Sequence, residues 1–181
     1  MWLPPIARTV IGAAHQRKGK PCQDFSFSGN FLSPGGQWLQ LMVVSDGHGG
    51  ERYWLSDVGS RLACEVAAIA VEAAAQKNSL DDQDLWMHLL AEELPKVIHQ
   101  QWLNAIRQDW HHQPKPDQQD FSPQLYGCTL GLVLMAPQWW GCTGLGDWDL
   151  VALQDGLAQL VSEESDLGAA VHGQAAAVAA R

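Results

Sequence analysis

A mostly apolar run from Leu39 to Ser45 ends abruptly at Asp46-Gly47-His48-Gly49-Gly50. An apolar run of this length predicts a buried strand, and the glycines predict a tight turn where the strand ends. The side chains of Asp46 and His48 therefore sit on backbone that can approach a ligand closely. Aspartate suits a hard cation, and histidine exchanges a proton near neutral pH. The alternative is an ordinary strand-to-helix turn, with Asp46 as a helix cap and His48 in solvent.

A second carboxylate is predicted to lie beside that of Asp46. Asp24 precedes the alternating strand pattern of Phe25–Ser28, and glycine-containing turns separate this strand from the run that ends at Ser45. Asp24 enters one strand and Asp46 leaves the next, so antiparallel pairing would bring both to the same edge of a sheet. Two carboxylates held together are unfavourable unless a cation shares them. Upstream, Thr9–Ala14 predicts a further buried strand.

Helical periodicity replaces the strand patterns in the middle of the chain. Apolar residues from Leu55 to Ala73 recur at helical spacing and predict an alanine-rich helix with one apolar face. The segment Ser79–Asp82 resembles a capping box and predicts the start of a second helix. Pro95 lies within the apolar stripe of that helix, so a kink or a break is expected there. The helix is expected to end at His111-His112.

The chain returns to strand patterns after a polar loop that contains prolines. Gly146-Asp147 is a third aspartate at the end of a predicted strand, and Asp155-Gly156 predicts a hairpin turn. The order of strands, two helices and further strands predicts a mixed sandwich of sheets covered by helices. Parallel alternation of strands and helices is missing, which argues against a Rossmann-type fold. The four strands are expected at residues 126–134, 139–144, 150–153 and 157–161.

The composition is that of one globular domain: 181 residues, 46% hydrophobic and 17% charged. The net charge of −9, without a basic stripe, disfavours nucleic acid as a partner. The four cysteines form no C-x-x-C pair, so reduced and buried thiols are expected. The N-terminus does not resemble a signal peptide, and no apolar run approaches the ~20 residues of a membrane span. We therefore expect a cytoplasmic protein that does not associate with a membrane.

Three segments, in this order, resemble motifs of the metal-dependent protein phosphatases of the PP2C (PPM) type. Gly12–Asp24, which ends in Pro21-Cys22-Gln23-Asp24, is similar to the first acidic motif of the bacterial branch. Val43–Gly50 is similar to the family's D-G-H-x-G motif. Tyr126–Leu130, followed by Leu145–Asp147, is similar to its G-[ST]-T and G-D-S pair. The resemblance extends from about Ala7 to Val161.

The resemblance implies an α+β fold, a four-layer α-β-β-α sandwich, with two Mn²⁺ or Mg²⁺ ions at one edge of its paired sheets. Asp46 would bridge both ions, the Gly47 carbonyl would ligate one of them, and Asp24 would lie in the same cluster. Water activated by the metal ions would attack phosphorus in line. His48 matches the residue thought to protonate the leaving group, and Asp147 matches the aspartate of a third, weaker metal site.

The chain also departs from the family pattern. The arginine that clamps the substrate phosphate is replaced by Gly19, leaving Lys18 and Lys20 as less directional charges. Trp148 replaces the serine that usually follows Gly-Asp. The later D-G and D-N motifs, which complete the metal site, are missing after Val161. We therefore expect a partial phosphatase domain over residues 1–165 that lacks its last strands, and an alanine-rich tail over residues 166–181 that resembles a truncated or frameshifted end.

Three readings of the function follow. The first is a metal-dependent phosphatase that hydrolyses phosphoserine or phosphothreonine in protein substrates, with a serine/threonine kinase as a further partner. The second is a catalytically silent or truncated PP2C-like module that acts in phospho-signalling by binding. The third, an unrelated metal-binding protein, requires all three motifs to coincide by chance. The first two differ in their need for cations, because only the enzyme requires a bound metal pair.

Overall fold

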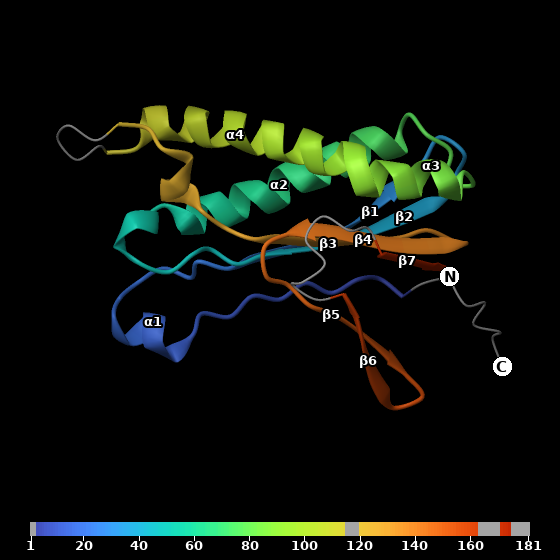
Figure 1. Cartoon of the computed structure of the whole chain (residues 1–181), viewed down its shortest axis with the longest axis horizontal. Coiled ribbons are helices and arrows are strands. Elements are labelled where there is room, and N and C mark those ends of the chain that lie inside the picture. The colour runs from blue at the N-terminus through green and yellow to red at the C-terminus, as the bar shows by residue number, and fades with distance from the viewer. Residues whose placement is uncertain (1–2, 115–119, 163–170, 175–181) are drawn as a thin grey trace.

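The computed structural model describes residues 3–114, 120–162 and 171–174. A layer of helices lies on one face of a sheet, and a separate hairpin lies on the other side of that sheet (Figure 1). Two 3₁₀ turns, at Glu51–Tyr53 and Pro123–Tyr126, flank the helical part of the chain. The helices are α1 (Ala13–Arg17), α2 (Ser56–Ala75), α3 (Gln83–His88) and α4 (Leu94–His112), and the strands are β1 (Phe25–Leu32), β2 (Trp38–Ser45), β3 (Leu130–Met135), β4 (Trp139–Leu145), β5 (Leu150–Gln154), β6 (Leu157–Ser162) and β7 (Val171–Gln174).

The large sheet has the strand order β1-β2-β3-β4-β7, and every neighbouring pair is antiparallel. The predicted β1–β2 hairpin and the strands β3, β4, β5 and β6 are confirmed, with shifted bounds. The predicted Asp155-Gly156 turn joins β5 to β6, and both of its residues have positive φ, at 52° and 78°. Strand β7 was not foreseen, because it lies in the segment that the sequence assigns to the tail. The rest of that tail, residues 166–170 and 175–181, lies outside the described residues.

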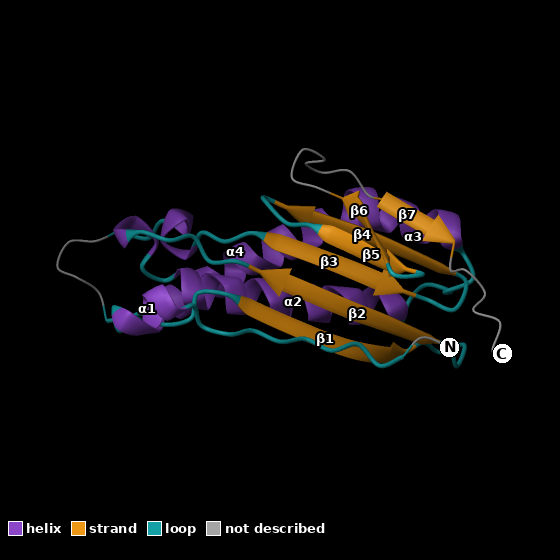
Figure 2. Ribbon diagram, turned by 90° about the horizontal axis from the view of Figure 1, so that it is seen from below, coloured by secondary structure: helices purple, strands orange, loops and turns teal. Residues whose placement is uncertain are grey.

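The helical layer lies on one face of the large sheet: α2 packs on β1 and β2, and α4 packs mainly on α2 (Figures 1 and 2). Alternate residues of β2, β3 and β4 face the helices and are almost completely buried, as the period of two in a strand requires. The central members of this core are Leu39, Leu41, Val43, Leu132, Leu134 and Trp139. A second cluster lies under one end of α2 and α4 and consists of Leu55, Ile106, Trp110, Leu125 and Tyr126.

The second predicted helix is broken near Pro95, as expected. Residues Leu89–Glu93 form a π-helical turn between α3 and α4, and Pro95 occupies the first turn of α4, where its missing N–H is tolerated. The predicted capping box, however, is wrong in its details. Asp82 is itself the N-cap, and its side chain accepts a hydrogen bond from the Leu85 N–H at 3.0 Å.

The predicted strand at Thr9–Ala14 is also wrong. Residues 9–12 have no regular structure, and α1 begins at Ala13. This N-terminal segment meets β1 through side chains: the Thr9 and Ser26 hydroxyls share a hydrogen bond, and the Ser28 hydroxyl donates to the Pro5 carbonyl. The segment's own side chains remain mostly exposed, so its β-branched residues do not form part of a buried strand.

The expected α+β fold with antiparallel sheets is confirmed. In the described residues, the second sheet of the sandwich is represented by the β5–β6 hairpin. No helix among the described residues is both long and apolar enough to span a bilayer.

Candidate active site at one end of the sheet

Strand register brings three aspartates to the same end of the large sheet. Phe25 of β1 pairs with Ser45 of β2, so Asp24 and Asp46 lie next to each other just beyond that pair. Leu130 of β3 pairs with Leu145 of β4, which places Gly146-Asp147 at the same end. The prediction that Asp24 and Asp46 share a sheet edge is therefore confirmed, and Asp147 joins them.

The backbone of the turn that carries Asp46 and His48 is held on both sides by neighbouring segments. On one side, the Asp46 N–H donates to Thr129 Oγ1 at 3.1 Å, and the Thr129 N–H donates back to the Asp46 carbonyl at 2.8 Å. The His48 N–H donates to the Gly127 carbonyl at 2.9 Å. On the other side, the Gly47 N–H donates to the Gln23 carbonyl at 3.1 Å. The turn is thus fixed between the segment before β1 and the segment before β3.

Gly47 has no room for a side chain. A Cβ placed there would lie 2.5 Å from the Gln23 carbonyl oxygen and 2.8 Å from the Ser56 carbonyl oxygen. Both are backbone atoms of packed segments, so the clash cannot be relieved by rotating a side chain. Only glycine allows this close approach, which sets the position of the Asp46 carboxylate.

Gln23 packs against the turn that carries Asp46 and His48, and its role there is not predicted by the sequence. Its buried side-chain amide donates to the His48 carbonyl at 3.2 Å and to the Ser56 hydroxyl at 2.5 Å. Its Oε1 atom is buried without a hydrogen-bond partner among the described residues. The only signal in the sequence is its position next to Asp24, which does not distinguish it from a solvated glutamine.

The environment raises the pKa of the Asp46 carboxyl above its ordinary value. The largest cause is desolvation, followed by a side-chain hydrogen bond with Asp24 and the negative charge of Asp24. The charge of Asp147 raises it further, whereas His48 lowers it. These carboxylates are therefore close enough to destabilise one another when all are ionised.

His48 lies beside this carboxylate group on an exposed part of the turn. Its ring meets Tyr53 edge to face, with ring centroids 5.1 Å apart. A Cβ on Gly127 would lie 2.8 Å from the His48 ring, so a side chain at position 127 would displace that ring. Tyr53, like Gln23, was missed by the sequence analysis, because one tyrosine after a glycine turn carries no recognisable signal.

Asp147 is held differently from Asp46. Gly146 adopts φ of 83° and packs against Thr129, and the indole of Trp148 covers Gly131 and Gly144 of the two neighbouring strands. A Cβ on Gly131 would lie 2.9 Å from that indole. The tryptophan that replaces the family's serine thus packs on the sheet beside the aspartate.

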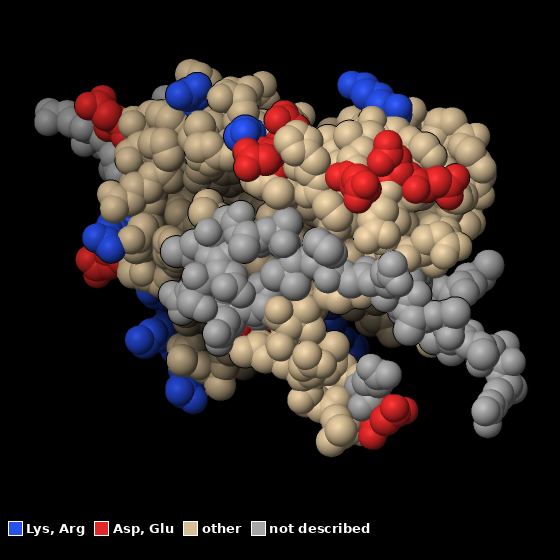
Figure 3. All heavy atoms as spheres, turned by 45° about the vertical axis from the view of Figure 1, so that its right-hand side comes forward, with Lys and Arg blue, Asp and Glu red and all other residues tan. Residues whose placement is uncertain are grey.

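Lys18 and Lys20 are exposed and follow α1, on either side of Gly19, which has φ of 62°. Both views place α1 at the same end of the molecule as the end of β2 (Figures 1 and 2). Figure 3 shows several basic side chains at the lower left of the molecule, and acidic together with other basic side chains over its upper part. The ion pairs among the described residues, Arg61–Glu65 and Lys96–Glu92, involve neither lysine.

The donor set at this end of the sheet suits a hard divalent cation, because it consists of carboxylate oxygens crowded against one another. However, no group of three or more His, Cys, Asp or Glu side chains within the described ranges is arranged to hold a metal ion. The fit is therefore partial: Asp24 and Asp46 form a close pair, and Asp147 acts on Asp46 through its charge.

Thiol chemistry is not supported at this end of the sheet. Burial raises the pKa of Cys128, which lies near Ser45 and Asp46, to about 11. Burial likewise raises the pKa of Cys64 to about 12. Both thiols are therefore protonated at neutral pH and are poor nucleophiles. All four cysteines are free, as expected, but only Cys64 and Cys142 are buried, whereas Cys22 and Cys128 are partly exposed.

Comparison with known proteins identifies the family. The chain is similar to a bacterial serine phosphatase, with a TM-score of 0.50 at 16% identity over 80% of this chain and 50% of that chain. A point variant of a bacterial serine phosphatase gives a TM-score of 0.50 at 16% identity, over 84% of this chain and 58% of that chain. The serine/threonine phosphatase PstP/Ppp of Mycobacterium tuberculosis gives a TM-score of 0.45 at 20% identity, over 87% of this chain and 52% of that chain.

At 16% identity the likeness to the two serine phosphatase structures concerns the fold alone. The chain spans about half the length of these solved structures. No curated protein gives a significant sequence match. The family model for protein phosphatase 2C matches residues 11–173, which include the Asp24, Asp46–Gly50 and Gly146-Asp147 segments. The chain therefore belongs to the protein phosphatase 2C family.

Proposed function

We propose that this chain is a metal-dependent phosphatase domain that hydrolyses phosphoserine or phosphothreonine in protein substrates. The observation that carries the proposal is the meeting of Asp24, Asp46 and Asp147 at one end of the sheet, with the pKa of Asp46 raised by its neighbours. A cation shared by these carboxylates would relieve their repulsion and would attract a phosphate dianion. A kinase partner and a cytoplasmic location belong to the same proposal, and the four free thiols suit a reducing compartment.

The residues of the sheet end have distinct roles in this proposal. Asp46, Asp24 and the Gly47 carbonyl would hold two Mn²⁺ or Mg²⁺ ions, with Asp147 near a third. The cations would supply the positive charge that activates water and screens the phosphate. Gly47 and Gln23 keep the Asp46 turn in place, and Lys18 and Lys20 would add charge for the substrate phosphate.

His48 is the proposed proton donor to the leaving serine or threonine oxygen. Its ring is exposed, is positioned by Tyr53 and Gly127, and lies near enough to Asp46 to lower the pKa of that carboxyl. Histidine is the side chain that serves most often as a general acid or base in enzymes. General acid catalysis contributes about 10²- to 10⁴-fold, so His48→Ala should reduce kcat by about that factor.

The test is hydrolysis of a phosphothreonine peptide by the full chain, with Mn²⁺ and with EDTA. We expect turnover that requires Mn²⁺ and is lost in Asp46→Asn. Asp84→Asn, which removes an exposed carboxylate from α3, is the matched control and should behave as wild type.

A second candidate function is a catalytically silent module that binds phosphoproteins. It is favoured by the partial fit of the site, because the described residues hold no complete group for a metal ion. A folded chain that binds the phosphopeptide but shows no turnover with Mn²⁺ would support this function and would contradict the enzyme.

A further inference from the structure

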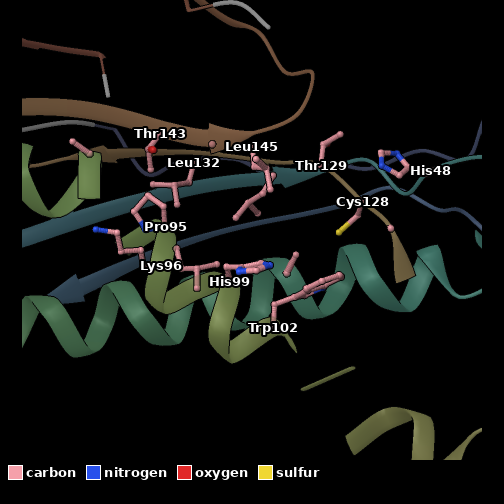
Figure 4. Close-up of a pocket in the computed structure, with 16 residues that line it drawn as sticks. His48, Pro95, Lys96, His99, Trp102, Cys128, Thr129, Leu132, Thr143 and Leu145 are labelled. Atoms are coloured by element: carbon pink, nitrogen blue, oxygen red, sulfur yellow. The ribbon is translucent and has the colours of Figure 1, made fainter. Parts of the chain in front are cut away.

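A cavity of about 530 Å³ lies between α4 and the strands β3 and β4 (Figure 4). It exists because α4 packs mainly on α2, whereas α2 packs on β1 and β2, so one part of the sheet is left without a helix directly against it. His48 lies at one end of the cavity, but Asp24, Asp46 and Asp147 do not line it. Its volume falls within the range of about 300–1,000 Å³ that is typical of small-molecule sites.

Flat and apolar groups form the two long walls of this cavity. On the α4 side, the rings of His99 and Trp102 are stacked, with centroids 6.3 Å apart and an interplanar angle of 21°. Trp102 Nε1 donates to the Gly59 carbonyl at 3.0 Å, which fixes the orientation of the indole. Leu132 and Leu145 lie on the sheet side, facing these rings (Figure 4). The space between the walls suits a planar ring.

One buried polar atom in the lining has no partner. Thr143 is only 2% exposed, and its Oγ1 atom has no hydrogen-bond partner among the described residues. Gly141, two residues earlier in β4, faces Leu90 of the helical layer, so Thr143 points to the same side of the sheet. A buried hydroxyl without a partner is unfavourable, and a ligand with one hydrogen-bonding group would satisfy it.

The lining carries little charge. Among the described residues that line the cavity, Lys96 is the one with a permanent charge, and its ammonium group already pairs with Glu92 at 2.8 Å. A charged ligand would therefore lose its hydration without gaining a free partner of opposite charge.

We propose that this cavity binds a small, uncharged, planar aromatic molecule whose single hydrogen-bonding group pairs with the Thr143 hydroxyl. The site is separate from the carboxylates, so binding does not depend on the proposed phosphatase activity. The end of the cavity that holds His48 is also lined by Gly127, Cys128 and Thr129, the segment whose backbone holds the Asp46 turn.

The test uses two probes that differ in one polar group, naphthol and methylnaphthalene, titrated calorimetrically into the full chain without metal. We expect saturable one-to-one binding of both. Thr143→Val keeps the shape of the side chain but removes its hydroxyl. This variant should weaken the binding of naphthol by roughly 3- to 10-fold and leave the binding of methylnaphthalene unchanged.

Ala91→Phe, which fills the cavity, should abolish binding of both probes, whereas Ala73→Phe, on an exposed face of α2, should bind as wild type. If circular dichroism shows that Ala91→Phe does not fold, the two probes on Thr143→Val decide the question. The proposal is overturned if neither probe binds saturably, or if Thr143→Val binds naphthol as tightly as wild type.

Discussion

Two turns at the same end of the sheet carry an aspartate next to a glycine, but they are built differently. The turn after β2, with Asp46, is fixed by backbone hydrogen bonds to the segments before β1 and β3 and by a glycine with no room for a Cβ. For the turn after β4, with Asp147, the described residues show no backbone hydrogen bond at residues 146–148, and packing of Trp148 on the sheet holds it.

This difference indicates which aspartate is preorganised. Asp46 cannot move without breaking contacts with two other segments. Its carboxylate is therefore held close to that of Asp24, whose charge raises the pKa of Asp46. Asp147 can adjust with the position of one indole ring. If the proposed metal binding occurs, this contrast predicts that it is tighter at Asp46 than at Asp147.

The largest effect is expected from Asp46→Asn. The substitution removes the carboxylate proposed to bind both metal ions, so hydrolysis of a phosphothreonine peptide should fall to the rate measured in EDTA, with the fold intact by circular dichroism. Asp84→Asn serves as the control. Retention of Mn²⁺-dependent turnover by Asp46→Asn would show that the rigid turn is not the centre of the site.

Gly47→Ala should have the next largest effect. The added Cβ meets two backbone carbonyl oxygens at 2.5 and 2.8 Å, so the turn must shift, at a cost of about 1–3 kcal/mol in the free energy of unfolding. Urea denaturation and peptide hydrolysis would both report the change. In the same turn, Gly49→Ala meets no atom within 4 Å and should be close to wild type. Equal stability of the two variants would contradict the account of the turn.

Trp148→Ala should affect the second turn alone. Loss of the indole from above Gly131 and Gly144 should cost about 1 kcal/mol of stability and weaken Mn²⁺ binding at the Asp147 position. The tighter Mn²⁺ sites should keep their affinity in a titration. Trp38→Ala, an exposed tryptophan at the opposite end of β2, is the control. Loss of the tight sites would mean that the two turns are not independent.

The smallest expected effect is a change in the thermal stability of Asp46→Asn when no metal ion is present. Because desolvation and the neighbouring carboxylates raise the folded-state pKa of Asp46 above its ordinary value, the ionised group destabilises the fold, and stability is lost as pH rises through the folded-state pKa. In EDTA at pH 7, Asp46→Asn should therefore unfold at a higher temperature than wild type, and the difference should shrink toward pH 4. With Mn²⁺ at pH 7 the order should reverse. A lower melting temperature for the variant in EDTA would contradict the raised pKa.

Much of this site follows from local sequence. The apolar run before Asp46 and the alternation before Ser28 determine two strands, and their antiparallel register places Asp24 beside Asp46. Glycine punctuation predicts the position of the turn and of the β5–β6 hairpin.

The supporting contacts could not be predicted from the sequence in the same way. Gln23 supports the turn by a hydrogen bond to the His48 carbonyl, 25 residues further along the chain, and Tyr53 contacts the His48 ring. Neither residue belongs to a sequence pattern that indicates such a contact. Strand β7 lies in an alanine-rich segment of low β-propensity, and its pairing with β4 is a tertiary effect. The N-terminal segment fails as a strand for the opposite reason, because its β-branched residues find no buried partner.

The most direct test of the central claim is the binding of Mn²⁺ itself, followed by loss of the free-ion signal in electron paramagnetic resonance. The account predicts saturable binding to the wild-type chain and to Asp84→Asn, and loss of the tight sites in Asp46→Asn. Equal binding of Mn²⁺ by wild type and Asp46→Asn would contradict the claim that the turn after β2 is the metal site.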